Sequence, residues 1–257
     1  MKRRDFAGTW RSSSKLLLPL RSIASVTGMM CVKSSLILQA GCLLCLSAPA
    51  RTGAQQVVSP RRRDFWIAGS LTVAATLPLD ARIREFMATH QSVTIDRVAR
   101  PIGEGGSPRD ILPVLVAAAV IPRLLGDPAT SNNAIDIGLG YAVATGTGFI
   151  LRRAIGRHRP DTSGRSLRFS PLHPGHEWHS FPSGHMLGAV ALATGISIKA
   201  DRPWVTSATY GLASMVGLQR LYVGKHWASD VVAGTLLGIA VSATTVRWRE
   251  RQRSQFP

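Results

Sequence analysis

Apolar residues are concentrated in six runs along the chain, and polar segments rich in turn-forming residues separate these runs. None of the runs alternates apolar and polar positions as a half-buried strand does. Several carry small residues at helical spacing, such as Gly184 with Gly188 and Gly234 with Gly238. The pattern therefore predicts a helix in each run. The six runs are Phe65–Leu79, Ile111–Leu125, Ile135–Leu151, Met186–Ile198, Trp204–Leu218 and Val231–Val246.

The segment between the first two runs, residues 80–103, is polar and amphipathic. Its apolar residues recur as on a surface helix, which predicts one or two additional helices. The expected fold class is all-α, a bundle of about six core helices with extra amphipathic helices. A composition with 24 glycines and only 6% aromatic residues fits closely packed helices better than a β-sandwich.

The chain is strongly basic, with 31 Lys and Arg against 14 Asp and Glu and a formal net charge of +17. Such an excess favours anionic partners, which include phosphate esters, acidic lipid headgroups and nucleic acid. No recognition motif or aromatic platform for nucleic acid accompanies the basic residues. Nucleic-acid binding is therefore not expected.

The first 50 residues have the features of an export leader. A basic residue precedes an apolar run at 36–46, and small residues at 47–50 form a cleavage site of the A-x-A kind. We expect a signal peptide over 1–50. The stretch before the apolar run is long for such a peptide, so Met29 or Met30 is the alternative start.

Behind the leader we expect a linker at 51–64, a single domain at 65–250 and a tail at 251–257 that forms a fraying, solvated helix end. The three cysteines all lie in the leader: they are Cys31, Cys42 and Cys45. Removal of the leader would leave a protein with neither a disulfide nor a cysteine metal site.

The apolar runs leave two locations open. Each run is shorter than the roughly 20 residues that cross a bilayer core. Basic clusters at 61–63, 199–202 and 247–253 would nevertheless fit the cytoplasmic ends of spanning helices. The expected location is the cell envelope, with the active site on the periplasmic side and the membrane surface nearby. An exported bundle is favoured, and an integral inner-membrane protein is the alternative.

Candidate chemistry begins where the third run ends. Arg152 and Arg159 are seven residues apart, about two helical turns, so both guanidinium groups can point the same way. A solvated basic helix cap is the simpler interpretation. Ser183 and Gly184 precede the fourth run, where free backbone N–H groups and the helix dipole can bind an anion. There the simpler interpretation is an N-cap.

A third group of polar residues lies between the last two runs. His226 and Asp230 are four residues apart, so the carboxylate can orient the imidazole and hold its tautomer. Asp230 could equally cap the last helix. Arg220 precedes this pair by six residues.

The order and spacing of these residues resemble the signature of the type 2 phosphatidic acid phosphatase (PAP2) superfamily, which includes bacterial acid phosphatases and vanadium haloperoxidases. The matching parts are Arg152…Arg159-Pro160, Pro182-Ser183-Gly184-His185 and Arg220…His226…Asp230. Two positions depart from that signature. Arg152 stands where the family usually has lysine, and Gln219 stands where it has serine.

The resemblance implies a metal-independent phosphatase that needs no cofactor and hydrolyses phosphomonoesters or diphosphates through a phosphohistidine. His226 would be the nucleophile, Asp230 would orient it, and His185 would be the general acid. The apolar helices around the site favour a lipid phosphate as the substrate. The expected phosphate-binding residues are Arg152, Arg159, Ser183, Gly184 and Arg220.

Other functions remain open at this point. A soluble, non-specific periplasmic acid phosphatase is the main alternative, followed by a vanadate-dependent haloperoxidase and an inactive anion-binding bundle. A metal site from His173, His176 and His179 is the rival interpretation of the histidine cluster. Their spacing spreads the side chains around a helix instead of onto one face, so we expect them in an access loop over 161–181.

Overall fold

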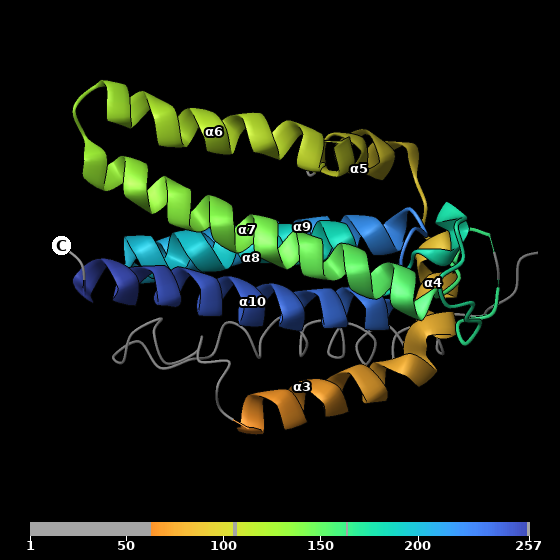
Figure 1. The fold of residues 1–257 in the computed structure, drawn as a ribbon. Coiled ribbons are helices and arrows are strands. Elements are labelled where there is room, and N and C mark those ends of the chain that lie inside the picture. Colours follow the sequence, from red (N-terminus) through yellow and green to blue (C-terminus); the bar gives the residue numbers. More distant parts are fainter. Residues whose placement is uncertain (1–62, 105–106, 163, 256–257) are drawn as a thin grey trace, which may run out of the picture. The chain divides into compact units, whose positions relative to one another are not determined.

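All six apolar runs are helical in the computed structural model, which describes residues 63–104, 107–162 and 164–255 (Figure 1). Within this part of the chain there is no β-strand, so the predicted all-α fold is confirmed. The runs correspond to α3 (Arg63–Thr76) with the 3-10 turn η1 (Leu77–Leu79), α6 (Pro108–Leu124), α7 (Pro128–Ile155), α8 (Gly184–Ala200), α9 (Pro203–Tyr222) and α10 (Ala228–Gln255). The described residues lie in one compact unit, Leu46–Pro257. The predicted leader, the alternative starts and most of the linker lie outside them.

Helix α8 is the centre of the bundle and packs against α7, α9 and α10. Two glycines of α10 face its first turns. A Cβ atom on Gly234 would lie 2.7 Å from the Ser183 carbonyl oxygen, and one on Gly238 would lie 2.7 Å from the Leu187 carbonyl oxygen. The spacing of small residues in the sequence therefore marks a close helix contact, which holds the start of α8 against α10.

The amphipathic segment forms two helices, α4 (Asp80–Thr89) and α5 (Val93–Glu104), as expected. Both contact α9, and they lie at the same end of the bundle as the loops that carry the motifs (Figure 1). Tyr222, at the end of α9, ties the segment down: its hydroxyl donates to Asp96 Oδ1 at 2.8 Å and accepts from the Ser92 N–H at 3.0 Å. The outer face of α5 keeps Val93, Ile95 and Val98 exposed.

Helices α7 and α10 are longer than the apolar runs that predicted them. Each has 28 residues, and each contains a stretch long and apolar enough to cross a membrane by length and composition alone. The lengths of the apolar runs therefore underestimated the lengths of these two helices. Polar residues at their ends, which interrupt a hydrophobic pattern, do not interrupt a helical backbone.

The tail continues α10 as one helix to Gln255. Three cations from α8 and α10 surround the buried carboxylate of Asp136 in α7. Lys199 Nζ lies 2.8 Å from Asp136 Oδ2, Arg249 Nε lies 3.4 Å from Oδ1, and Arg253 also pairs with this carboxylate. A buried acid needs such partners, and they hold the end of α10 on the bundle.

Many large apolar side chains remain exposed on the sides of the bundle, and we call these residues the apolar belt. They lie on α3, α6, α7 and α9. The belt consists of Trp66, Ile67, Leu71, Leu112, Val114, Val116, Val120, Ile121, Leu139, Val143, Phe149, Ile150, Leu212, Met215 and Leu218. Exposed apolar surface on this scale is characteristic of an interaction surface rather than of an isolated soluble domain.

Candidate active site

The three motifs meet at one end of the bundle. The end of α7 and its following loop carry the first motif, the start of α8 carries the second, and the α9–α10 connection carries the third (Figure 1). Backbone hydrogen bonds link the three segments. The Ser183 N–H donates to the Asp230 carbonyl at 3.0 Å, and the Ser180 N–H donates to the Arg157 carbonyl at 3.0 Å. Residues far apart in the sequence thus share one site.

The start of α8 lacks the side-chain cap that its sequence suggested. Ser183 occupies the N-cap position, but its side chain makes no capping hydrogen bond. Its Oγ atom is buried and has no hydrogen-bond partner. Gly184 provides the space for an arginine, because a Cβ atom there would lie 2.3 Å from Arg152 Nη1. The capping interpretation of Ser183 therefore does not account for its hydroxyl group.

Two arginine donors are left open at the same place. In the described part of the chain, the buried side-chain atoms without a hydrogen bond include Arg152 Nη1 and Arg159 Nε together with Ser183 Oγ. The guanidinium groups of Arg152 and Arg159 repel each other electrostatically, and so do those of Arg159 and Arg220. Buried like charges with unused donors are costly unless an anion binds between them. The chemistry of this donor set fits a phosphate group.

The loop position of Arg159 has an electrostatic consequence. Burial lowers the pKa of its guanidinium below the ordinary value, while the nearby Asp161 and Asp230 partly oppose this effect. Arginine has so high an ordinary pKa that the group stays charged at neutral pH. A phosphate in the site would supply the counter-charge that it lacks.

The third arginine is held by the residue that departs from the family signature. Arg220 Nε donates to Gln219 Oε1 at 2.5 Å. The backbone of α5 lies over this pair, since a Cβ atom on Gly103 would be 2.3 Å from Arg220 Nη2 and 2.5 Å from Gln219 Nε2. Gln219 therefore orients the arginine through an amide oxygen, and α5 closes that side of the site.

His226 is buried and held in one orientation. Its side chain is only 4% exposed, and its Nδ1–H donates to the Ser180 carbonyl oxygen at 2.8 Å. This bond fixes the tautomer and leaves the lone pair on Nε2. Asp230 Oδ2 lies 3.7 Å from Nδ1, too far for a hydrogen bond. Asp230 instead accepts a hydrogen bond from the Ser180 hydroxyl and so acts on the segment that holds the imidazole.

The protonation of His226 follows from its surroundings. Burial lowers its pKa below the ordinary value, and the charge of Asp230 opposes this effect without overcoming it. The imidazole is therefore neutral at neutral pH. A histidine nucleophile attacks in this neutral form.

His185 lies in the first turn of α8 and is partly exposed. Charges on His226, Arg220 and Arg159 all act on it, so it borders the same space. Burial, followed by these positive charges, lowers the pKa of His185 to about 3, so its imidazole is neutral in the empty site. A bound phosphate would add negative charge beside it and favour the protonated form that a general acid requires. The structure thus brings together every residue that the sequence analysis assigned to the site.

Comparison with known families gives a match that covers the motifs. The sequence model of a family described as the PAP2 superfamily matches residues 133–254, a span that contains all three motifs. The resemblance to the PAP2 superfamily is therefore confirmed over residues 133–254. The match begins within α7, so α3 to α6 lie before the PAP2 segment.

Curated relatives of the PAP2 segment are phosphatases by name. The chain is 35% identical to the lipid A 1-phosphatase of Porphyromonas gingivalis over 105 residues, which are 40% of this chain and 21% of that protein. It is 36% identical to that of Rhizobium johnstonii over 98 residues, which are 37% and 39% of the two chains. It is 28% identical to the putative undecaprenyl-diphosphatase YbjG of Escherichia coli over 132 residues, or 51% and 64%. The chain thus spans only 21% and 39% of the lengths of these two lipid A 1-phosphatases.

Two crystal structures share the fold. Aquifex aeolicus LpxE superposes with a TM-score of 0.53 at 21% identity, covering 66% of this chain and 95% of the other. A transmembrane PAP2 type phosphatidylglycerolphosphate phosphatase from Bacillus subtilis gives a TM-score of 0.59 at 21% identity, covering 76% and 98%. The expected PAP2-like helical bundle is therefore confirmed.

The remaining histidines of the cluster lie beside the PAP2 site, in the segment over 161–181. His179 Nε2 donates to the His173 carbonyl at 3.2 Å, and the rings of His176 and His179 meet edge to face at 5.6 Å. Burial lowers the pKa of His179. Among the residues that the structure describes, no group of three or more His, Cys, Asp or Glu could hold a metal ion. The role of this segment as an access loop stays a prediction.

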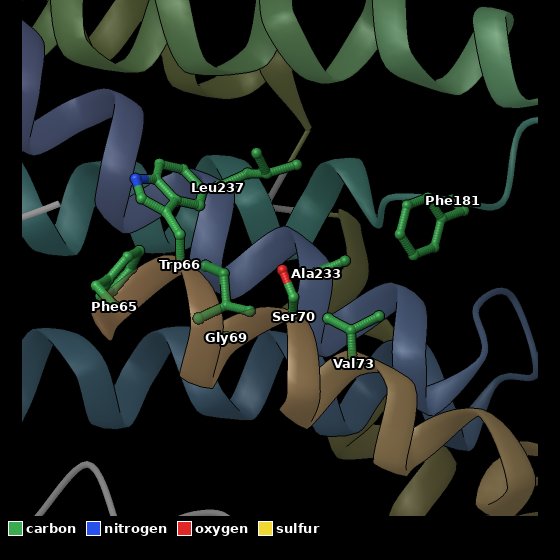
Figure 2. Close-up of a pocket in the computed structure, with 9 residues that line it drawn as sticks. Phe65, Trp66, Gly69, Ser70, Val73, Phe181, Ala233 and Leu237 are labelled. Atoms are coloured by element: carbon green, nitrogen blue, oxygen red, sulfur yellow. The ribbon is translucent and has the colours of Figure 1, made fainter. Parts of the chain in front are cut away.

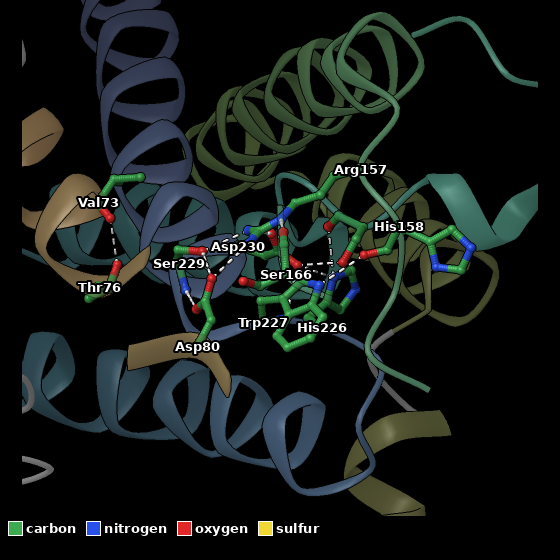
Figure 3. A network of polar contacts seen from close by, with 11 residues as sticks. Val73, Thr76, Asp80, Arg157, His158, Ser166, His226, Trp227, Ser229 and Asp230 are labelled. Carbon is green, nitrogen blue, oxygen red and sulfur yellow. Dashed lines mark hydrogen bonds and ion pairs between the residues drawn. The ribbon is translucent and has the colours of Figure 1, made fainter. Parts of the chain in front are cut away.

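Sequence reasoning missed a set of residues behind the nucleophile. The sequence analysis gave Arg157 no role, yet it is 0% exposed and bonds to both Asp230 and Asp80 (Figure 3). Trp227 Nε1 donates to the His158 carbonyl at 2.8 Å and joins the same network. No spacing rule connects these residues. The only available signal was a charged residue, Asp80, directly after an apolar run.

Gly184 provides a direct test of the phosphate donors. In Gly184→Ala the new Cβ would displace the Arg152 guanidinium, a flexible group, so the fold should survive. We expect the dissociation constant for inorganic phosphate, measured by calorimetry, to rise about tenfold, the loss of one charge-assisted hydrogen bond. Gly211→Ala is the control, because no atom lies within 4 Å of a Cβ there. Unchanged phosphate affinity in Gly184→Ala would contradict the assignment of Arg152.

Proposed function

We propose that the protein is a lipid phosphate phosphatase that works through a phosphohistidine and requires no metal. The observation that carries this proposal is the set of buried, unpartnered donors of Arg152, Arg159 and Ser183 beside the neutral imidazole of His226. Phosphoryl transfer needs a positioned nucleophile and positive charge around the equatorial oxygens. Arginines provide here the charge that metal ions provide in other phosphatases.

The proposed reaction has two steps. In the first, His226 Nε2 attacks phosphorus while the bond to the leaving oxygen breaks, and His185 gives that oxygen a proton. In the second, water attacks the phosphohistidine, His185 takes a proton from the water, and the bond from phosphorus to Nε2 breaks. Inorganic phosphate and neutral His226 are regenerated. Both steps develop charge on oxygens held by the three arginines.

An apolar pocket supports a substrate with a hydrocarbon chain. The pocket has a volume of about 260 Å³ and lies between α3 and α10 (Figure 2). Phe181, two residues before Ser183 in the chain, lines one end of it. The relatives named lipid A 1-phosphatase and undecaprenyl-diphosphatase support the same substrate class. The other lining residues are Phe65, Trp66, Gly69, Ser70, Val73, Ala233, Leu236 and Leu237.

We further propose that the bundle is embedded in the inner membrane with the site at the periplasmic face. The apolar belt and the length of α7 and α10 support this integral-membrane alternative over an exported soluble bundle. The basic residues Lys199, Arg249 and Arg253 pair with Asp136 in α7. Asp136 lies about 24 Å along α7 from Arg152, so these cations are at the end of the bundle opposite the site. Positive charge favours the cytoplasmic side.

The test is phosphate release by the detergent-solubilised protein in EDTA, with phosphatidic acid, a polyprenyl diphosphate and p-nitrophenyl phosphate as substrates. We expect full activity in EDTA, inhibition by vanadate, and a kcat/KM at least ~10-fold higher for a lipid substrate than for the soluble ester. Equal activity on the soluble ester would favour a non-specific acid phosphatase. Bromination of a dye with vanadate and peroxide, without phosphate release, would favour a haloperoxidase.

A further inference from the structure

Arg157 lies between two carboxylates in the interior of the protein (Figure 3). Its Nη2 donates to Asp80 Oδ2 at 2.7 Å, and its Nη1 donates to Asp230 Oδ1 at 2.6 Å. The remaining nitrogen of the guanidinium, Nε, donates to the Ser166 carbonyl at 2.8 Å. Both side chains of each ion pair are at most 1% exposed. These charges are therefore screened very little by water.

Asp80 also grips the first turn of α10. Its Oδ1 accepts from the Ser229 N–H at 2.9 Å, and its Oδ2 accepts from the Ser229 hydroxyl at 2.6 Å. Ser229 precedes Asp230 directly in the chain. The carboxylate of Asp80 thus binds two residues that contact or adjoin Asp230. Arg157 forms an ion pair with the Asp230 side chain, and Ser229 precedes Asp230 in the chain.

The charges in this cluster suit the chemistry proposed for His226. Asp80, Arg157 and Asp230 together carry one net negative charge. His226 gains positive charge when Nε2 bonds to phosphorus. The buried cluster then becomes neutral overall, which stabilises the charged imidazole in a site that excludes water.

We propose that Asp80, which lies outside the PAP2 segment, is a positioning residue that acts through Arg157 on the orientation and charge of His226. This inference rests on the proposed role of His226 as the nucleophile. It assigns a function to α4, a helix that precedes the PAP2 segment and begins at Asp80. A second contact, from Arg84 Nε to the Pro160 carbonyl at 3.1 Å, links α4 to the phosphate-binding loop.

The proposal predicts effects of opposite sign. His226 is faced by Asp230 from α10, Arg159 from the α7–α8 connection and His185 from α8. Asp80→Asn removes a negative charge from behind this group and should disfavour the imidazolium. Arg157→Gln removes a positive charge and should favour it. A role in folding alone would not shift protonation in opposite directions.

The experiment measures the protonation midpoint of His226 by NMR in the full chain, with kcat and KM for phosphate release from a lipid phosphate. We expect the midpoint to rise in Arg157→Gln by at least ~0.5 pH unit and to fall in Asp80→Asn. In Asp80→Asn we expect kcat to fall about tenfold with KM within about twofold of wild type, because the loss concerns the charged imidazole. The double variant loses one charge of each sign and should return the midpoint close to wild type.

Asp136→Asn is the matched control. Asp136 is likewise a buried, ion-paired acid, but it lies at the other end of α7. Both acid variants should lower Tm, and only Asp80→Asn should change kcat. An unchanged midpoint in Arg157→Gln, or equal kcat losses in the two acid variants, would overturn the inference.

If wild type releases no phosphate, the proposed function fails, and the NMR midpoints alone decide whether Asp80 and Arg157 act on His226. If Arg157→Gln does not fold, the kcat of Asp80→Asn against Asp136→Asn decides.

Discussion

His226→Ala is expected to lower phosphate release by a factor of about 10³ or more, because the variant has no atom that can form the phosphoenzyme bond. Water attacking the bound substrate directly would supply only the residual rate. Substrate affinity should change little, since the arginine donors remain. Rapid-quench measurement of phosphate release at several substrate concentrations, in wild type and in the variant, gives the rate and the substrate affinity. Quenching the reaction during turnover should trap a phosphorylated protein in wild type only.

A second buried histidine provides the control for this prediction. His158 is 7% exposed and contacts Thr162 and the ring of Trp178. His158→Ala should therefore destabilise the loop without removing the reaction. A His226→Ala protein that retains wild-type phosphate release would rule out the histidine mechanism.

His185→Ala is expected to depend on the leaving group. For a lipid phosphate the leaving alkoxide needs a proton, and loss of a general acid costs about 10²–10⁴-fold in kcat. For p-nitrophenyl phosphate the leaving group is stable as an anion, so the loss should be less than about tenfold. The measurement is kcat for both substrates in wild type and variant. Equal losses on the two substrates would mean that His185 contributes to binding and not to proton transfer.

The acid limb of the pH profile follows from the lowered pKa of His226. The group must be neutral to attack, so activity is lost only as pH falls through its folded-state value. We therefore expect kcat/KM to remain high at pH 6.5, the ordinary value for histidine, and to decline at lower pH. A profile that falls by half at pH 6.5 or above would contradict the burial of this group.

Much of the site was predictable because its residues are ordered by local geometry. The helix start at Gly184 presents free N–H groups as expected, whereas α7 ends at Ile155 and Arg159 reaches the site from the following loop instead of from a second helical turn. Four residues of spacing place Asp230 near His226. Only the start of α8 is a relation within one helix, because Arg159 follows α7 and His226 precedes α10.

Several details depended on long-range packing instead. The spacing suggested that Asp230 holds the His226 tautomer directly, whereas the Ser180 carbonyl makes that hydrogen bond. Ser180 is 46 residues away along the chain. The hydroxyl expected at position 219 is replaced by an amide that orients Arg220. No periodicity reports which of several polar atoms will be closest after folding.

The length of the helices was misjudged for the same reason. Polar and charged residues at the ends of α7 and α10 shortened the apolar runs, although their backbones remain helical. The pairing of Arg249 and Arg253 with Asp136 keeps the end of α10 folded. A charged tail is solvated unless a distant acid is buried beside it, and only the tertiary structure shows that acid.

The hydrophobic period indicated the helical class, and the resemblance of the ordered motifs to the PAP2 signature indicated the candidate phosphate donors. The tertiary structure decided which of those donors are buried without partners, and it placed Asp80 and Arg157 behind the nucleophile. The physical reason is that burial and charge pairing arise between segments distant in the chain. Asp80 and Ser229 are separated by 149 residues, and only folding brings them within hydrogen-bonding distance.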